Sequence, residues 1–182
     1  MNKWSLLFSF SLVVQAPAYS GVLMNQEEAL TLVFPEGAAV DRRSLFIRDE
    51  SVKEIEERAK SKLDSQLVNY YVGRTTAGVA GYAFFHTHQV RTMPETLMVA
   101  VNPDGSLRLV EILAFYEPDD YRPPRRWLDL YSGKKLDDDL WVKRGIRNIA
   151  GATLSTRAIT DAVRRTLAIF EISIMPGESR KR

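Results

Sequence analysis

Four segments rich in β-branched and aromatic residues follow one another in the middle of the chain and constrain its fold more than any other feature. They read LVNYYVGR, VAGYAFFHTHQVR, TLMVAVN and LRLVEILAFYE, within residues 67–117. The turn Asn-Pro-Asp-Gly at 102–105 joins the last two as a hairpin, and the threonine-containing stretch between Gly73 and Gly81 gives an earlier reversal. We therefore expect an antiparallel β-meander of about four strands.

Two helices are predicted ahead of this sheet. Asn25 and Glu28 have the spacing of a capping box, which predicts a short helix over residues 26–34. Ser51 and Glu54 repeat this spacing, and apolar residues then recur at helical intervals.

A longer helix is predicted near the end of the chain, in NIAGATLSTRAITDAVRRTLAIF (148–170). One face is apolar and is expected to pack on the sheet, whereas the other face is charged. The apolar face comprises Ala158, Ile159, Ala162, Val163, Thr166, Leu167 and Phe170, and the residues expected to point away are Arg157, Asp161, Arg164 and Arg165. The expected fold is a single α+β domain, an antiparallel β-meander packed against helices on one side.

The first residues, MNKWSLLFSFSLVVQAPAYSG, have the features of an export signal. Lys3 precedes an apolar run over 4–14, and Ala-Pro-Ala at 16–18 offers a cleavage site, with Ser20 as an alternative. The run is shorter than the ~20 apolar residues that a membrane span needs. We expect a signal peptide at 1–20 and a mature chain in the periplasm or on the outer face of the cytoplasmic membrane. A buried first helix or an uncleaved anchor is the alternative.

Composition excludes several classes of function. The chain has no cysteine, so it offers no disulfide, thiolate nucleophile, cysteine-ligated zinc or iron–sulfur cluster. Its 25 lysines and arginines nearly balance 23 aspartates and glutamates, and basic clusters alternate with acidic runs. This pattern argues against nucleic acid as a partner. The length of 182 residues suits one domain.

The start of the last helix has the local chemistry of a phosphate site. A helix N-terminus has unpaired N–H groups and the positive end of the helix dipole, so it stabilises an anion. Gly151 and Ala152 add little bulk there, and Thr153, Ser155 and Thr156 supply hydroxyl groups. Serine and threonine are also ordinary N-cap residues, so a plain capped helix is the structural alternative.

The segment AGATLSTRAITDAVRR (150–165) resembles the Ser-Gly-Ala-Thr-Leu-[Ser/Thr]-[Ser/Thr] motif of the FMN-binding domain. This domain occurs in the C subunit of the sodium-translocating NADH:quinone reductase and the G subunit of the Rnf electron-transport complex. The order of the other elements is similar to that family: a strand with Gly81 and Tyr82, a hairpin with an Asp-Gly turn, and Glu117 where a Glu-Thr-Pro-Gly loop would start. The resemblance spans about residues 72–170 and is closest to the small, stand-alone exported members.

The resemblance implies FMN as the cofactor, joined by a phosphoester to Thr153 by a flavin transferase after export. It also implies a domain organisation of an N-terminal helical region at 21–71, an FMN-binding domain at 72–175 and a flexible basic tail at 176–182. The cofactor-binding residues expected on this basis are Thr153, Gly151, Ala152, Leu154, Ser155, Thr156, Glu117 and Tyr116.

The expected function is electron relay between redox partner proteins, in association with a membrane redox complex, rather than catalysis by a stand-alone enzyme. Two residues depart from the Asp-x-x-[Ser/Thr]-Gly-Ala-Thr pattern expected for the transferase: Arg147 replaces the aspartate and Ala150 the hydroxyl residue. An arginine beside a flavin phosphate would instead strengthen non-covalent binding. A flavin-free adapter module and a non-covalent FMN-dependent reductase are therefore the alternatives.

Other candidate sites are weaker. Strand alternation puts His86 and His88 on one face, but no third ligand has diagnostic spacing for a metal, so a structural pair is expected. Glu95, Glu111 and Glu117 are expected to be surface carboxylates rather than a catalytic pair. The aromatic residues of 121–141 are expected to anchor loops, with a wall beside the flavin ring as the alternative.

Overall fold

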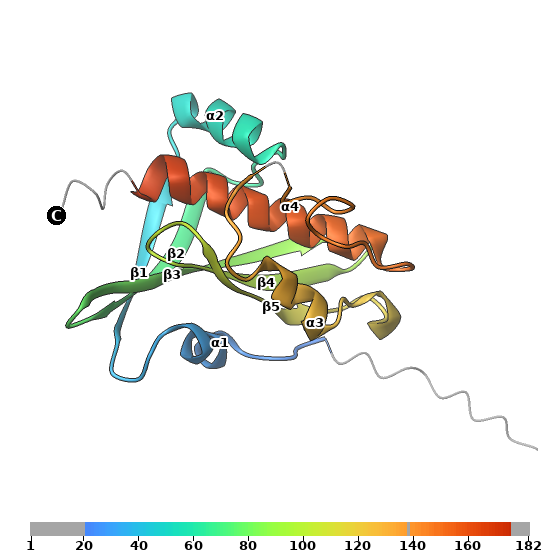
Figure 1. Cartoon of the computed structure of the whole chain (residues 1–182), viewed down its shortest axis with the longest axis horizontal. Helices are drawn as coiled ribbons and strands as arrows, with labels where there is room; N and C mark the ends of the chain where they lie inside the picture. Colours follow the sequence, from blue (N-terminus) through green and yellow to red (C-terminus); the bar gives the residue numbers. More distant parts are fainter. Residues whose placement is uncertain (1–20, 138, 176–182) are drawn as a thin grey trace, which may run out of the picture.

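A computed structural model describes residues 21–137 and 139–175 of the chain. Its centre is a five-stranded antiparallel sheet in the order β1-β2-β3-β4-β5 (Figure 1). The strands are β1 (Ala39–Phe46), β2 (Leu67–Thr75), β3 (Gly78–Gln89), β4 (Pro94–Val101) and β5 (Leu107–Phe115). The helices are α1 (Gln26–Val33), α2 (Asp49–Ala59), α3 (Arg125–Leu128) and α4 (Thr153–Ile169), with short turns η1 (Asp119–Tyr121), η2 (Asp129–Tyr131) and η3 (Phe170–Ile174). The expected α+β meander is confirmed.

The two N-terminal helices begin for different reasons. The Asn25 side chain accepts the N–H of Glu28 at 2.9 Å, and the Glu28 carboxylate accepts the N–H of Asn25 at 2.9 Å, so α1 has the predicted capping box. The capping box predicted at Ser51 is wrong, because α2 already begins after Arg48 without a side-chain cap. Asp49 and Glu50 occupy its first turn instead, where acidic groups stabilise the helix dipole.

Strand β1 was not predicted. It lies between α1 and α2, so the two helices do not simply precede the sheet. Its sequence AVDRRSLF is mostly exposed, as expected of an edge strand, and it pairs with β2 along its whole length. Adjacent charges interrupt its apolar pattern, and such charges are tolerated at a sheet edge.

Helices cover both faces of the sheet rather than one (Figure 1). The larger core lies beneath α4 and α2 and contains Tyr82, Phe84, Leu97 and Val99. On the opposite face, α1 helps to bury a smaller hydrophobic cluster, which consists of Ala29, Val33, Phe34, Ala83, Met98, Ala100 and Leu113. The strands therefore bury both faces, and the second face is covered by α1 together with the flanking residues Met24 and Phe34.

The other edge of the sheet is covered by the segment Gly21–Met24. The N–H of Phe115 donates to the carbonyl of Gly21 at 2.7 Å, and the N–H of Leu23 donates to the carbonyl of Leu113 at 2.8 Å. The chain thus adds a short extended piece to β5.

Helix α4 is more deeply buried than its pattern predicts. The predicted apolar face does pack on the sheet, but Arg164 and Arg165, expected to point away, are 1% and 9% exposed. Arg164 donates to the carbonyls of Arg58 and Ala59 at the end of α2. A second layer, α2 and the loop residues 136–137 and 139–146, covers the face that was expected to meet solvent.

The predicted signal at 1–20 and the basic tail at 176–182 lie outside the described residues. Within the part of the chain that the structure describes, no helix has both the length and the apolar character needed to cross a bilayer.

Candidate functional site

The first turn of α4 has no side-chain cap. Its N-cap residue is Ala152, whose side chain cannot accept a hydrogen bond, so the capped-helix alternative does not describe this turn. Gly151 precedes it with φ +87°, a left-handed conformation that favours glycine, and a Cβ there would meet no atom within 4 Å. By helix geometry, the first N–H groups of α4 have no intrahelical acceptor. This helix end therefore lacks a side-chain acceptor, the role that an anion fills at such a terminus.

Thr153 sits in this turn beside an asparagine that the sequence analysis did not single out. Asn148 Nδ2 donates to Thr153 Oγ1 at 3.4 Å, and Thr156 Oγ1 donates to Asn148 Oδ1 at 3.3 Å. Thr153 is half-buried, so its hydroxyl is both oriented and reachable. Asn148 lies on the loop before the helix, and no periodicity or spacing in the sequence distinguishes it.

The other residues of the turn that were predicted to bind the cofactor differ in how exposed they are. Ser155 and Thr156 are buried, whereas Leu154 is 44% exposed. The Thr156 hydroxyl lies within reach of both Asn148 Oδ1 and the carbonyl of Thr153, at 3.3 and 3.1 Å, so its one hydrogen is shared between two acceptors. Among these hydroxyls, Thr153 is the one that a reagent from solvent reaches most readily.

A cavity of about 480 Å³ lies beside this turn and shares Asn148 with it. This volume is in the range of small-molecule and cofactor sites. Trp127 forms part of the wall and donates from Nε1 to the carbonyl of Arg147 at 2.5 Å. Its ring meets that of Tyr131 edge-on at 5.3 Å. The complete lining is Pro124, Arg126, Trp127, Leu130, Arg147, Asn148 and Ile149.

These residues fit a flavin mononucleotide. The cavity offers an aromatic wall, two guanidinium groups from Arg126 and Arg147, and an adjoining helix N-terminus. Planar rings stack on aromatic walls, and phosphate is stabilised by guanidinium groups and helix N-termini. Trp127 is 4% exposed and packs in the larger core, as expected of a loop anchor, and it lines the cavity with its remaining surface.

Tyr116 and Glu117 have local structural roles. Glu117 Oε1 accepts the N–H groups of Arg91, Thr92 and Met93 at 3.2, 2.7 and 3.0 Å, so it holds the turn between β3 and β4. These bonds, that of Thr92 first, hold the pKa of Glu117 below its usual value. Tyr116 packs its ring over Gly21. No hydrogen bond or ion pair found among the described residues joins this pair to Gly151–Thr156.

The two histidines share a face, as expected, and both lie under α4. His86 Nε2 is 2.6 Å from Thr166 Oγ1, and His88 Nε2 is 3.0 Å from Glu95 Oε2. Glu95 is fully buried rather than a surface carboxylate, and burial raises its pKa. No group of three or more histidine, aspartate or glutamate side chains suited to a metal ion occurs in the described ranges.

Comparison with protein families gives a match within the second half of the chain. Residues 93–168 match the family model described as the FMN-binding domain. This stretch contains β4, β5, the cavity lining and almost all of α4, and thus the whole Gly-Ala-Thr turn. No curated protein matches the chain.

Proposed function

The chain carries an FMN-binding domain with FMN as its cofactor, and we propose that it is an exported electron carrier whose FMN is attached to Thr153. The observation that carries this proposal is the uncapped first turn of α4, with the Thr153 hydroxyl held by Asn148 at the edge of a cofactor-sized cavity. Flavin binding follows from the family match, whereas attachment, electron relay between partners and export are the proposal.

Attachment at Thr153 would need an activated FMN donor, since a phosphoester does not form readily from a free phosphate and an alcohol in water. The donor class is a flavin dinucleotide, which holds the FMN phosphate in an anhydride. Thr153 Oγ1 forms the new bond to phosphorus, the P–O–P bond breaks, a nucleoside monophosphate leaves and the hydroxyl proton passes to solvent or to the transferase. Asn148 Nδ2 orients the hydroxyl oxygen for this step.

The residues around the turn would bind and orient the cofactor. The N–H groups at the start of α4 stabilise the phosphate, and Arg126 and Arg147 offset its charge. Trp127 provides an apolar surface for a planar ring. When bound, FMN supplies one- or two-electron transfer, and the protein contributes binding and electrostatics. No catalytic acid–base pair is needed for such a carrier.

Export is supported by the N-terminal pattern alone, a lysine, an apolar run and Ala-Pro-Ala at 16–18. Arg147 supports a second candidate, non-covalent FMN binding at the same cavity, because a guanidinium group there binds a free phosphate without any ester.

The test is the intact mass of the chain produced with a flavin transferase in an exporting host. The wild type is expected to gain one FMN less one water and to lose the N-terminal segment after residue 18 or 20. Thr153→Ala is expected to stay at the polypeptide mass. Thr76→Ala, which removes an exposed hydroxyl in the β2–β3 turn, is the matched control and should gain FMN normally.

Three other results would decide against parts of the proposal. A yellow wild type at bare polypeptide mass would establish non-covalent binding. A colourless wild type would favour the flavin-free adapter. An unshortened chain found in the cytoplasm would overturn export and leave the attachment site untouched.

A further inference from the structure

Strands β2 and β3 separate partway along the sheet. Their ladder runs from Thr75 and Gly78 to Tyr70 and Phe84 and ends there. Strand β1 nevertheless stays paired with β2 as far as Leu67, and β4 stays paired with β3 as far as Gln89. The two halves of the sheet therefore diverge as intact two- and three-stranded pieces, with an opening between them.

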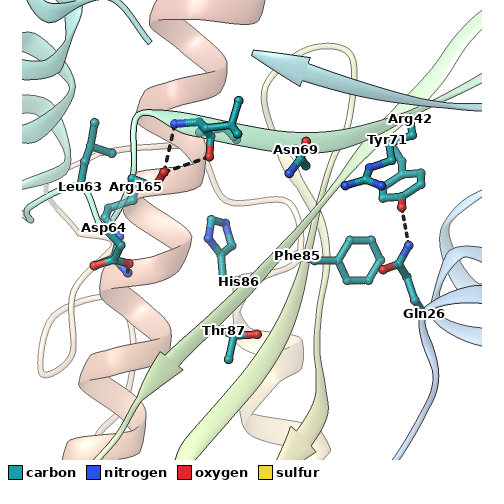
Figure 2. Close-up of a pocket in the computed structure, with 13 residues that line it drawn as sticks. Gln26, Arg42, Leu63, Asp64, Asn69, Tyr71, Phe85, His86, Thr87 and Arg165 are labelled. Atoms are coloured by element: carbon teal, nitrogen blue, oxygen red, sulfur yellow. Dashed lines mark hydrogen bonds and ion pairs between the residues drawn. The ribbon is translucent and has the colours of Figure 1, made fainter. Parts of the chain in front are cut away.

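The opening is a cavity of about 460 Å³ (Figure 2). Continuing the antiparallel register past Tyr70 and Phe84 would pair residues 69 with 85, 68 with 86, and 67 with 87. All six of these residues line the cavity. The complete lining is Gln26, Arg42, Leu63, Asp64, Ser65, Leu67, Val68, Asn69, Tyr71, Phe85, His86, Thr87 and Arg165. The cavity thus occupies the place of three missing pairs.

Toward this opening, both backbone groups of Leu67 are already bonded to Ser65 Oγ, at 3.0 and 3.2 Å, whereas the ladder leaves Asn69 and residues 85–87 without a strand partner on this side. Backbone N–H and C=O groups need partners, and an edge of this kind is a template for another strand. Three residue positions correspond to about 10 Å of extended chain. An extended peptide would continue the ladder along β3 and pair with β2 at Asn69, whereas a compact small molecule would satisfy fewer of these groups.

His86 places a hydrogen-bond acceptor in the middle of the opening (Figure 2). Thr166 Oγ1 donates its only hydrogen to the carbonyl of Ala162 at 2.9 Å, so it accepts from His86 Nε2 at 2.6 Å. The ring proton is therefore on Nε2, and Nδ1 has a free lone pair. A hydroxyl side chain on the α4 side of an inserted strand could donate to it.

The opposite side of the opening is basic. Arg42 on β1 lies directly across from Tyr71 and shares its face of the sheet, and the two lie side by side in Figure 2. Arg42 is exposed and forms no ion pair with any residue in the described ranges. Arg165 is already paired with Asp64 at 2.9 Å. The charge available to a ligand is therefore that of Arg42, on the face that α1 covers.

The opening is also separate from the FMN-binding domain. Of its lining residues, Arg165 alone falls within the matched range 93–168, and Thr153 is not among them. The cavity proposed above for FMN therefore shares no lining residue with this opening.

We propose that the opening between β2 and β3 binds an extended segment of a partner protein, in which acidic side chains facing Arg42 alternate with hydroxyl side chains facing His86. The segment adds as a strand along residues 85–87 of β3 and pairs with β2 at Asn69. Charge selects the partner, and main-chain hydrogen bonds supply most of the affinity.

The proposal is tested by amide NMR and hydrogen exchange on the whole chain, with and without FMN. The probes are two blocked peptides that alternate threonine with glutamate or threonine with lysine. In the free chain, the amides facing the opening are expected to exchange rapidly, except that of Leu67, which donates to Ser65 Oγ. The glutamate peptide should shift the NMR resonances of these amides and slow their hydrogen exchange. The lysine peptide should do neither.

Charge reversal gives the matched pair of variants. Arg42→Glu should weaken binding of the glutamate peptide about tenfold, since an attraction becomes a repulsion. Lys53→Glu makes the same charge change on the exposed side of α2 and should leave the affinity unchanged. Neither residue lines the FMN cavity, so FMN incorporation reports that both variants are folded.

Several results would overturn the proposal. Slow exchange of these amides in the free chain would show a closed ladder. Absence of binding, or shifts confined to another surface, would remove the site. Equal binding of the two peptides, or equal effects of the two variants, would exclude an acidic partner.

Discussion

At the scale of single residues, Arg164 shows how one buried cation can hold separate segments together. Its guanidinium group donates to the carbonyls of Ala59, Asp137 and Leu140 at 2.8, 2.8 and 3.2 Å, and it lies 4.2 Å from the centre of the Trp141 ring. Helix α2 and the loop before α4 thus share one donor.

Replacing Arg164 should therefore cost much of the stability. Arg164→Met keeps the side-chain volume but leaves buried carbonyls without donors, so the free energy of unfolding should fall by about 2–4 kcal/mol. Arg157→Met, on the exposed side of the same helix, should change it by less than about 0.5 kcal/mol. Urea unfolding measures the free energy of unfolding of both variants. Similar losses in the two variants would contradict a role of Arg164 in holding α2 and the loop together.

His86 gives the molecule an acid-sensitive contact. Burial, with help from the charges of Arg165 and His88, lowers its pKa to about 4. The neutral ring therefore contributes stability above the unfolded pKa of about 6.5, and this contribution is lost as the pH falls toward 4.

Ring-proton NMR should accordingly give His86 a midpoint near pH 4. Between pH 6.5 and 4, the free energy of unfolding of the wild type should fall by more than that of His86→Gln. The glutamine keeps a donor for Thr166 but does not titrate. If the free energies of unfolding of the two proteins depended on pH in the same way, the folded-state pKa of His86 would not be this low.

At the scale of elements, the start of α4 combines a free helix end with an oriented hydroxyl. Asn148 contacts Thr153 through Nδ2 and Thr156 through Oδ1. Asn148→Ala should slow FMN attachment severalfold, because Thr153 then loses its orientation. The melting temperature should change little, since Asn148 is exposed. A mass-spectrometric time course of attachment makes the measurement, and an unchanged rate would exclude this role.

Periodic elements were largely predictable from the sequence, and the exceptions have physical causes. The strands around Tyr82 and Val99 and the capping box at Asn25 follow from local patterns. Strand β1 could not be predicted from a local pattern, because its charged residues are stabilised by pairing with β2, which is a long-range contact. The burial of Arg164 likewise depends on α2 covering α4, which helical periodicity alone does not reveal.

The candidate site likewise contains residues that the sequence predicted and residues that it did not. The turn containing Thr153 was found because a linear motif carries it, and the family match contains it. Asn148 joins the site from the loop before α4, and Trp127 and Arg126 join it from the four-residue helix α3, which is too short to show a periodic pattern. The opening between β2 and β3 was invisible because a ladder that stops early leaves the strand pattern unchanged.

At the scale of the whole molecule, the N-terminal region and the matched range share one core. Ile47, Ile55 and Tyr70 pack in the same cluster as Leu97 and Ile159. The cofactor-binding half is thus completed by residues that precede it in the chain.

The fragment 72–175 should consequently fail to fold cooperatively. It lacks β1, α2 and most of β2, so it exposes one edge of β3 and leaves Arg164 without its acceptors on α2. Weak dispersion in NMR spectra, dye binding to apolar surface and a broad thermal transition are expected, whereas the whole chain should melt sharply. A sharp transition of the fragment would mean that 72–175 is an independent folding unit.

The short segment Gly21–Met24 along β5 has a consequence for association between molecules. Bare strand edges recruit strands from other chains and so promote fibril growth. Here the polypeptide blocks one outer edge with its own backbone, while Asp41 and Arg43 on β1 put charges along the other. A chain cleaved past Met24 would expose the apolar edge of β5 and acquire a route to self-assembly that the longer chain lacks.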